Sequence, residues 1–326
     1  MGGIGKTTLA KVVYNKLSNE FQDCSFIADI RESSKRKGIS CLQNQLILDI
    51  LKGNNHVSSI DEGIRIMESR FKCKKVLILL DDVDEIDELK TLVGKHDWFK
   101  MGSKIIITTR KKSVLDYAEV NCTYELKEIT MDKSLILFSR HAFLRDSPLC
   151  GYESLSHEVV TTTRGLPLAL EVIGSFLWRK KQVIWQDTLK ELKEVPHEKV
   201  QKKLKISYDA LPSKEQQMFL DIACFFIETY SRIASYMWDD CNLHSALGIE
   251  RLSFMSLIKI GYNHEFIMHD QLRDLGRAIA RQEDYHDLMN RSRLWVHEEA
   301  LKVLQTNKVI VTSIVDLLSF YMISLD

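Results

Sequence analysis

The sequence predicts an α/β domain built on a parallel sheet, followed by a region that is mostly helical. Three observations lead to this prediction. A glycine-rich turn at residues 1–8 runs directly into a helical pattern, two apolar runs end in polar residues at 81–82 and 108–110, and strand-like patterns stop after about Thr130. Continuous apolar runs are typical of strands buried on both faces, as in parallel sheets. Amphipathic patterns at helical spacing dominate the rest of the chain.

The glycine-rich turn reads Met1-Gly2-Gly3-Ile4-Gly5-Lys6-Thr7-Thr8. It fits most of the phosphate-binding loop signature G-x-x-x-x-G-K-[ST], with Gly5, Lys6 and Thr7 in the last three places. A helical pattern to Leu17 follows, and phosphate binding uses such a helix start because its backbone N–H groups point at the ligand. The simpler alternative is a glycine-rich turn before a helix, but the match is too specific for that alternative to be favoured.

Each residue of the loop has an expected role. Lys6 would place its charge on the β- and γ-phosphates, and Thr7 would give its hydroxyl to Mg²⁺. The residues expected to bind the nucleotide in this loop are Gly3, Gly5, Lys6, Thr7 and Thr8. The sequence therefore predicts a P-loop NTPase domain that uses ATP or ADP with Mg²⁺.

The first glycine of the signature and the strand that leads into the loop would precede Met1. We therefore expect a parallel sheet whose first strand is missing, from a domain excerpt or a gene model that starts too late. A sheet without a central strand exposes unpaired hydrogen-bonding edges inside the core. Poor folding of the isolated chain and weak nucleotide binding are the expected consequences.

A second motif lies at the end of the apolar run from Val76 to Leu80. Asp81 and Asp82 follow this run, at the carboxyl end of the predicted strand, where open α/β sheets bind ligands. We expect Asp81 to hold Mg²⁺ through water, and Asp82 to orient or deprotonate the attacking water. An aspartate pair after a strand is also common as a helix cap, and the upstream phosphate loop favours the catalytic interpretation.

Three further strands are predicted. Residues 24–30 form a short β-rich run, Gly102 to Arg110 form a second buried strand, and Tyr124 to Leu126 are expected to form the last strand. Arg110 falls at the same sheet edge as Asp81, where its guanidinium could pair with γ-phosphate oxygens. The alternative is a surface arginine in a basic cluster.

The remaining chain is predicted to be helical, with a small hairpin near residues 258–268 that suggests a winged helix. Gly165 would end one helix and Pro167 would open the next. Asp270 is expected to cap the helix that follows the hairpin, and His269 beside it is by default a structural histidine.

The predicted domains are a P-loop domain at 1–129, a helical domain at 130–195, a winged-helix domain at 196–285, and at 286–326 a linker or the start of a leucine-rich repeat region.

The composition argues against nucleic acid, a cysteine-bound metal ion and a membrane as partners. Lys and Arg number 45 and Asp and Glu number 45, so the formal net charge is zero, which argues against binding nucleic acid by bulk electrostatics. The basic stretch 199–205 is most simply a solvated helix face. Seven cysteines without a C-x-x-C pair fit a reducing compartment and predict no metal site. The apolar tail Val309–Leu325 is interrupted by polar residues, so a buried element is favoured over a membrane span.

Seven segments occur in one order and together resemble a known module. They are residues 1–8, 26–32, 79–84, 102–110, 165–169, 219–226 and 268–270. The chain resembles the NB-ARC nucleotide-binding module of plant disease-resistance proteins, a STAND-class P-loop NTPase. Two features resemble the subclass with an N-terminal TIR domain. Asp84 stands where the coiled-coil subclass usually has Trp, and the residues of segments 26–32 and 219–226 are of the kind that the TIR subclass has there.

The resemblance implies an ADP/ATP switch with slow hydrolysis, so any enzymatic activity would be that of a slow ATPase. In the ADP-bound state His269 would reach the β-phosphate, Pro167 would pack on the adenine, and Arg110 would await the γ-phosphate. ATP would permit self-association through the nucleotide-binding domain. Neither the TIR domain, with its NADase activity, nor a leucine-rich repeat array is recognisable in this chain.

A pathogen effector or a guarded host protein would be recognised by regions outside the chain, in the cytoplasm or the nucleus. Two alternatives remain open at this point. One is a truncated, non-catalytic relative that acts only as an interaction module. The other is a DNA-binding regulator that uses its winged helix, for which the basic stretch gives slight support.

Overall fold

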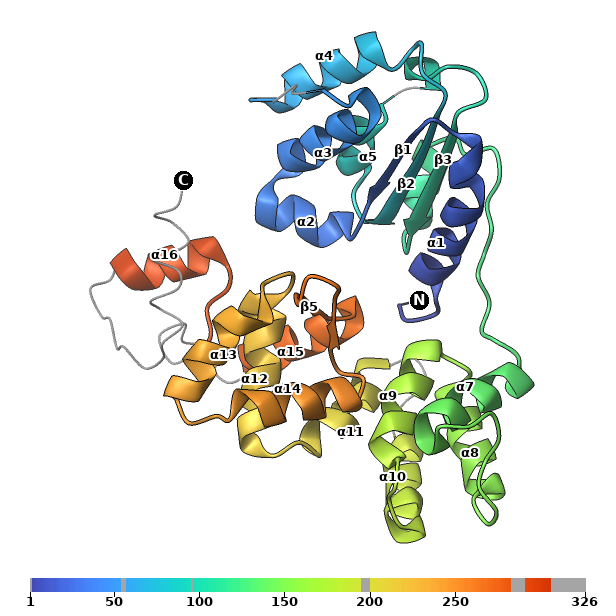
Figure 1. Cartoon of the computed structure of the whole chain (residues 1–326), viewed down its shortest axis with the longest axis vertical. Coiled ribbons are helices and arrows are strands. Elements are labelled where there is room, and N and C mark those ends of the chain that lie inside the picture. The colour runs from blue at the N-terminus through green and yellow to red at the C-terminus, as the bar shows by residue number, and fades with distance from the viewer. Residues whose placement is uncertain (1, 54–56, 95, 195–199, 283–290, 306–326) are drawn as a thin grey trace. The chain divides into compact units, whose positions relative to one another are not determined.

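The computed structural model describes residues 2–53, 57–94, 96–194, 200–282 and 291–305. The chain divides into two compact units, one running from Gly3 to Lys127 and one beginning at Glu128. Figure 1 shows the elements of each unit. The apolar tail Val309–Leu325 lies outside the described residues.

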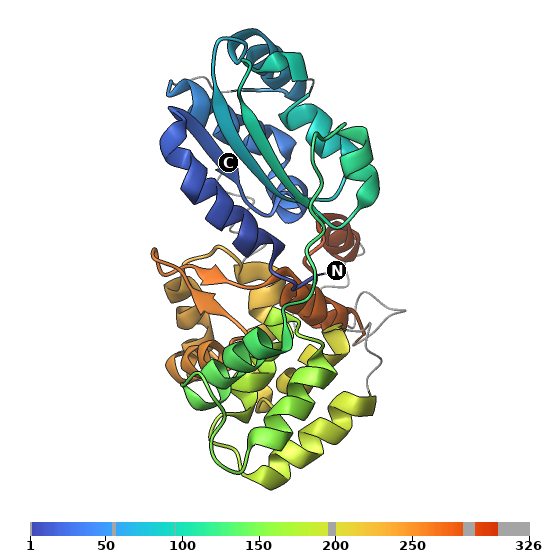
Figure 2. The ribbon, with the colours of Figure 1, turned by 90° about the vertical axis from the view of Figure 1, so that its right-hand side faces the viewer.

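The first unit is a three-stranded parallel sheet covered by helices. Its strand order is β1-β2-β3, so β2 is paired on both sides, and the strands run side by side in Figure 2. The elements are α1 (Lys6–Leu17), η1 (Ser18–Glu20), β1 (Asp23–Ile27), α2 (Ile30–Lys37), α3 (Ile39–Leu51), α4 (Ile60–Arg70), β2 (Val76–Val83), α5 (Ile86–Leu92), η2 (His96–Trp98), β3 (Lys104–Thr109) and α6 (Lys112–Tyr117). The predicted α/β class is confirmed.

The central strand β2 is buried on both faces, as its continuous apolar sequence predicts. Side chains alternate between the two faces of a strand. Val76, Ile78 and Leu80 belong to a core cluster shared with α3, α4 and α5. Leu77 and Leu79 are equally buried but lie outside that cluster, which places them on the opposite face, where α1 contacts β2.

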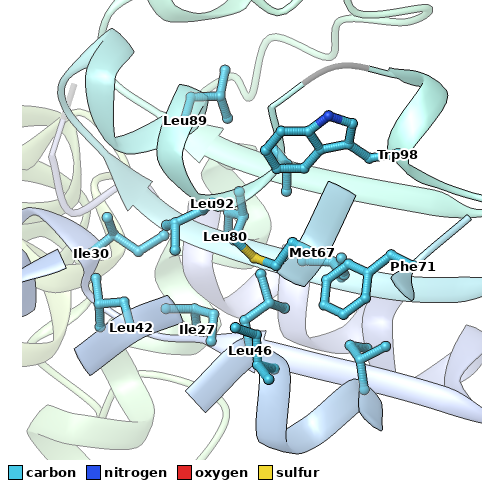
Figure 3. Packing of buried hydrophobic residues seen from close by; sticks show 14 of the residues in the cluster. Ile27, Ile30, Leu42, Leu46, Met67, Phe71, Leu80, Leu89, Leu92 and Trp98 are labelled. Atoms are coloured by element: carbon cyan, nitrogen blue, oxygen red, sulfur yellow. The ribbon is translucent and has the colours of Figure 1, made fainter. Parts of the chain in front are cut away.

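Figure 3 shows the cluster on the first of these faces. Met67 and Phe71 of α4 and Leu46 of α3 lie close to Leu80 of β2, and all four side chains are fully buried. Burying a side chain of this size stabilises a fold by roughly 1.5–3 kcal/mol. The cluster therefore holds the helices against the sheet and fixes the position of the strand ends.

A β-bulge interrupts the carboxyl end of β2. Leu80 is paired with Ile107 and Val83 with Thr109, so Asp81 and Asp82 together stand opposite the single residue between them on β3. Val83 consequently faces the same core cluster as Leu80, although the two residues are an odd number of positions, three, apart. Asp82 adopts a left-handed backbone with φ of 53°. Bulges of this kind redirect side chains and are frequent beside functional sites.

Helix α3 buries one face, which includes Leu42, Leu46 and Ile50. Helix α2 was not predicted: the left-handed backbone of Asp29 ends the extended segment, and a helix starts at Ile30. The strand predicted at Tyr124 to Leu126 is wrong, because this segment has no strand pairing and Tyr124 is 76% exposed.

The second unit consists of helices and one small hairpin. Its elements are α7 (Met131–Phe143), α8 (Glu153–Thr163), α9 (Pro167–Leu177), α10 (Gln182–Glu194), α11 (Val200–Asp209), α12 (Ser213–Asp221), the π-helical turn η3 (Ile222–Phe226), α13 (Ser231–Asp240), α14 (Ser245–Phe254), β4 (Lys259–Ile260), β5 (Phe266–Ile267), α15 (Asp270–Gln282) and α16 (His297–Gln305). The hairpin β4–β5 is antiparallel, as predicted, and appears as orange arrows in Figure 2.

Aromatic side chains form the core of helices α7 to α10. Trp185 is 1% exposed, stacks on Phe143 with ring centroids 5.3 Å apart, and contacts Phe138 edge-on at 5.7 Å. Among the later helices, Gly276 of α15 approaches the π-helical turn so closely that an added Cβ would lie 2.6 Å from the Cβ of Ala223. A glycine is required there because any larger residue would push α15 off the turn.

One basic residue of the stretch 199–205 departs from its predicted solvated position. Lys203 is fully buried, and its Nζ donates to the backbone oxygen of Thr162 at 2.6 Å. Burial, together with the nearby charge of Arg164, lowers the pKa of Lys203. The predicted solvated face is therefore wrong for Lys203, which links α11 to the end of α8.

Replacement of Thr108 by valine tests the bulge in β2. The Thr108 hydroxyl donates to Asp81 Oδ1 at 2.6 Å and accepts the backbone N–H of Asp82 at 2.9 Å. Valine keeps the shape but leaves both groups without this partner, so Thr108→Val should lower the free energy of unfolding by about 1–3 kcal/mol. Urea denaturation measures this loss.

The matched control is Thr108→Ser, which keeps the hydroxyl and should lose much less stability. Equal losses for the serine and valine variants would show that the methyl group, and not the hydroxyl, stabilises the bulge.

Candidate functional site

The start of α1 and the end of β2 meet at the carboxyl edge of the sheet. The Thr7 hydroxyl donates to both carboxylate oxygens of Asp81, at 2.9 and 3.1 Å. Thr108 donates to the same carboxylate. The two residues predicted to share Mg²⁺ are thus in direct contact, although 74 positions separate them in the sequence.

Burial changes the acid–base properties of this edge. It raises the pKa of Asp81, although the hydrogen bonds from Thr108 and Thr7 act in the opposite direction. Lys6 lies close to Asp81, Asp82 and Arg110, and its pKa is lowered, first by burial and then by the charge of Arg110. A buried carboxylate with hydroxyl partners and a half-buried ammonium group form a donor set suited to a phosphate and a hard cation.

The loop before α1 has the backbone that its glycines permit. Gly3 and Gly5 have φ values of 75° and 96°, in the left-handed region that favours glycine. Gly5 precedes the helix without a capping side chain, and the first turn contains no acidic residue. Thr8 in that turn is exposed. A helix start with these properties presents backbone N–H groups and a positive dipole end to an anion.

Asp82 lies between two guanidinium groups. Arg31 Nε is 3.2 Å from Asp82 Oδ2, and Arg110 Nε is 3.2 Å from Asp82 Oδ1. These side chains are largely buried, with 19%, 21% and 14% exposure for Arg31, Arg110 and Asp82. The predicted surface-cluster alternative for Arg110 therefore does not describe its position. The catalytic role predicted for Asp82 would require its carboxylate to exchange one of these partners for water.

Two residues of this edge were not assigned a role from the sequence. Arg31 belongs to α2, a helix that was not predicted. Thr108 lies in the predicted strand from Gly102 to Arg110, in which only Arg110 was assigned a role. A signal was present for both. Each comes from the carboxyl end of a strand adjacent to β2, and parallel strands bring these ends to one edge.

Two predicted nucleotide-binding residues, Pro167 and His269, belong to the second unit, so their position relative to the phosphate loop stays a prediction. Pro167 is the first residue of α9, as predicted. The helix-capping prediction is wrong, because α15 begins at Asp270 itself. The residue at the cap position is His269, whose backbone oxygen accepts from Arg273 N at 3.0 Å.

The side chain of His269 takes part in the same cap. Its Nδ1 accepts the backbone N–H of Gln271 at 3.1 Å, and it is also in contact with Asp270 Oδ1. These contacts turn Nδ1 toward the helix start.

The described residues contain no membrane-spanning helix and no cluster of metal-binding side chains. No helix of that part is long and apolar enough to cross a membrane. Over the same residues, no group of three or more His, Cys, Asp and Glu side chains could enclose a metal ion. All seven cysteines are free thiols. The candidate site is therefore the edge formed by α1, β2 and β3.

Comparison with known proteins identifies two domains. The model of the NB-ARC domain matches residues 1–147, and the model of the Roq1-like winged-helix domain of disease-resistance proteins matches residues 212–284. Among solved structures, a STAND protein with a tetratricopeptide repeat sensor from Pyrococcus horikoshii has a similar fold, with a TM-score of 0.51 at 17% identity over 95% of this chain and 43% of that one.

Curated plant proteins are similar over nearly the whole chain. Disease resistance protein RUN1 of Vitis rotundifolia is 42% identical over 298 residues, which are 90% of this chain and 22% of that protein. TMV resistance protein N of Nicotiana glutinosa is 37% identical over 314 residues, which are 94% and 27%. The chain spans less than a third of the length of these relatives. The family predicted from the seven segments is confirmed: the chain belongs to the NB-ARC family of plant disease-resistance proteins, in the TIR-type subclass.

Proposed function

We propose that the chain is the nucleotide-dependent switch of an intracellular plant immune receptor, at rest with ADP and signalling with ATP. The observation that carries this proposal is the contact of Thr7 with Asp81, which joins the phosphate loop to the strand that supplies the acidic residue. A loop, a lysine and a buried carboxylate at one sheet edge are the parts that P-loop NTPases require.

Mg²⁺ fits the donor set at this edge. The Thr7 hydroxyl and the Asp81 carboxylate are oxygen ligands, which Mg²⁺ prefers, and Asp81 would act through water. A bound cation would offset the negative charge of the phosphates and of Asp81. Thr7 and Thr108 donate hydrogen bonds to this carboxylate and so orient it.

Slow hydrolysis is consistent with the position of Asp82. Its carboxylate is paired with Arg31 and Arg110, so it is not free to orient a water molecule without a rearrangement. Hydrolysis would then reset the switch at a low rate instead of driving a metabolic reaction. The catalytic assignment of Asp82 and Asp81 is part of this proposal.

The second unit would close over the nucleotide in the ADP-bound state. Pro167 would pack on the adenine, and His269, whose Nδ1 is turned toward the start of α15, would reach the β-phosphate with its other ring nitrogen. The proposed division is a P-loop domain at 1–129, a helical domain at 130–195, a winged helix at 196–285 and a linker or repeat start at 286–326.

The proposal extends to partners. Exchange for ATP would release the closure and permit self-association, while an effector or guarded host protein would act through other regions. The setting would be the cytoplasm or the nucleus. Physically, this is a two-state element whose equilibrium is biased by a single phosphate.

Lys6→Ala tests nucleotide binding. Nucleotide is extracted from the denatured, purified protein and quantified, and bound ADP in the wild type would favour the switch over an interaction module that binds little nucleotide. Loss of a charge-assisted contact to phosphate should reduce affinity about tenfold or more, because such contacts contribute roughly 1.5–3 kcal/mol. Lys16→Ala, at the exposed end of the same helix, is the matched control and should retain ADP. Equal nucleotide content in Lys6→Ala and wild type would contradict the proposal.

Asp81→Asn and Thr7→Val test the cation. In the wild type, removing Mg²⁺ with EDTA should weaken ATP binding. In either variant the oxygen donor set is reduced, so EDTA should have little further effect. Calorimetric titration of ATP with and without Mg²⁺ measures both affinities. A variant that keeps the full Mg²⁺ dependence would show that its residue does not hold the cation.

Asp270→Val tests the closure. Loss of the carboxylate beside His269 should disturb the cap of α15, favour the open state and speed the release of bound ADP. The rate of exchange of a fluorescent ADP analogue measures this release, with Asp240→Val, at the exposed end of α13, as the control. Equal ADP retention by wild type and Asp270→Val would count against the proposed role.

A further inference from the structure

The carboxylate of Asp82 is shared by two arginines from different elements. Arg31 of α2 approaches Oδ2, and Arg110, which follows β3, approaches Oδ1 at 3.2 Å and Oδ2 at 3.5 Å. Asp82 belongs to β2, Arg110 follows the end of β3, and Arg31 lies at the start of α2, shortly after the end of β1. The arrangement is therefore a small charged cluster built at the sheet edge.

Backbone conformation orients the Asp82 side chain and sets the position of Arg31 in this cluster. The bulge and the left-handed φ of Asp82 turn its side chain away from Asp81 and toward the arginines. At the end of β1, Asp29 is also left-handed, and its backbone oxygen accepts the N–H groups of Glu32 and Ser33. Helix α2 consequently starts at the sheet edge, and Arg31 occupies its second position.

The Asp82 carboxylate has two cationic partners. Arg31 and Arg110 each approach it at 3.2 Å, and the Lys6 ammonium lies near both Asp81 and Asp82. A phosphate group can therefore take one guanidinium without leaving the carboxylate unpaired. If Asp82 had a single arginine partner, transfer of that arginine to phosphate would strand a largely buried negative charge, which is strongly unfavourable.

We propose that Arg31 is a positioning residue that keeps Asp82 paired when Arg110 transfers to the terminal phosphate of a nucleoside triphosphate. Arg31 thereby sets the preference of the site for triphosphate over diphosphate, without contacting the phosphate. This inference rests on the proposed nucleotide switch and adds a residue that controls it. Arg110 is the group that moves, and Arg31 is the group that permits the movement.

Affinities for ATP and ADP, measured by calorimetry on the purified protein, test the inference. Arg31→Ala should lower the ratio of ATP to ADP affinity about tenfold, because Arg110 is then the remaining arginine partner of Asp82, while ADP affinity changes little. Arg31→Lys should restore part of the preference, since it keeps the charge. In an Asp82→Asn background, Arg31→Ala should have no further effect on the ratio.

Controls separate this role from a merely structural one. Lys35→Ala removes an exposed positive charge from the same helix and should leave the ratio unchanged, and thermal unfolding identifies any variant that has lost its fold. If Arg31→Ala does not fold, Arg31→Gln replaces it, because a neutral amide keeps hydrogen-bonding capacity at similar size.

Each possible outcome decides a question. An unchanged ratio in Arg31→Ala, together with a changed ratio in Arg110→Ala, overturns the inference and leaves the proposed function intact. A loss of ATP affinity that persists in the Asp82→Asn background also overturns it, because Arg31 would then contact the phosphate directly. Absence of nucleotide binding by the wild type overturns the proposed function and the inference together.

Discussion

The Thr108 hydroxyl fixes the geometry on which the candidate site depends. It bonds the side chain of Asp81 and the backbone of Asp82 at once, so one residue of β3 serves two residues of β2. Without the bulge, adjacent residues of a strand would point to opposite faces of the sheet. With it, both carboxylates lie at the sheet edge but are presented to different partners, one to α1 and the other to α2 and the end of β3.

This division separates two kinds of chemistry. Asp81 is buried among hydroxyl groups, an environment that raises its pKa and suits an oxygen-ligated cation. Asp82 is neutralised by arginines, an environment that suits the exchange of one ion pair for another. Two identical side chains, adjacent in sequence, thus have different surroundings. The difference arises from the pairing of β2 with β3 and from the left-handed backbone conformation of Asp82.

Sequence patterns predicted the elements whose apolar residues follow a regular pattern. The apolar run from Val76 to Leu80 gave a strand close to the observed β2, because burial on both faces determines such a run. Ordered motifs gave the family. The expected strand at Tyr124 failed, because a β-like composition does not supply a pairing partner.

The rest could not be predicted from one sequence because it depends on tertiary contacts. The bulge requires knowledge of the register between β2 and β3, and the role of Arg31 requires knowing that α2 begins at the sheet edge. Burial of Lys203 depends on the Thr162 carbonyl oxygen, which accepts a hydrogen bond from its Nζ at the end of α8. His269 replaced Asp270 at the helix cap because helix boundaries are uncertain by one or two residues even when the element is correct.

The change of side-chain direction at the bulge in β2 determines which substitutions, insertions and deletions this strand can accept. Between Val76 and Val83 the strand fills the core with every second residue and then changes phase by one position. Apolar substitutions of similar volume leave this phase intact, whereas a single codon inserted or deleted would exchange the surroundings of the two aspartates. This segment should therefore tolerate change in composition but not in length.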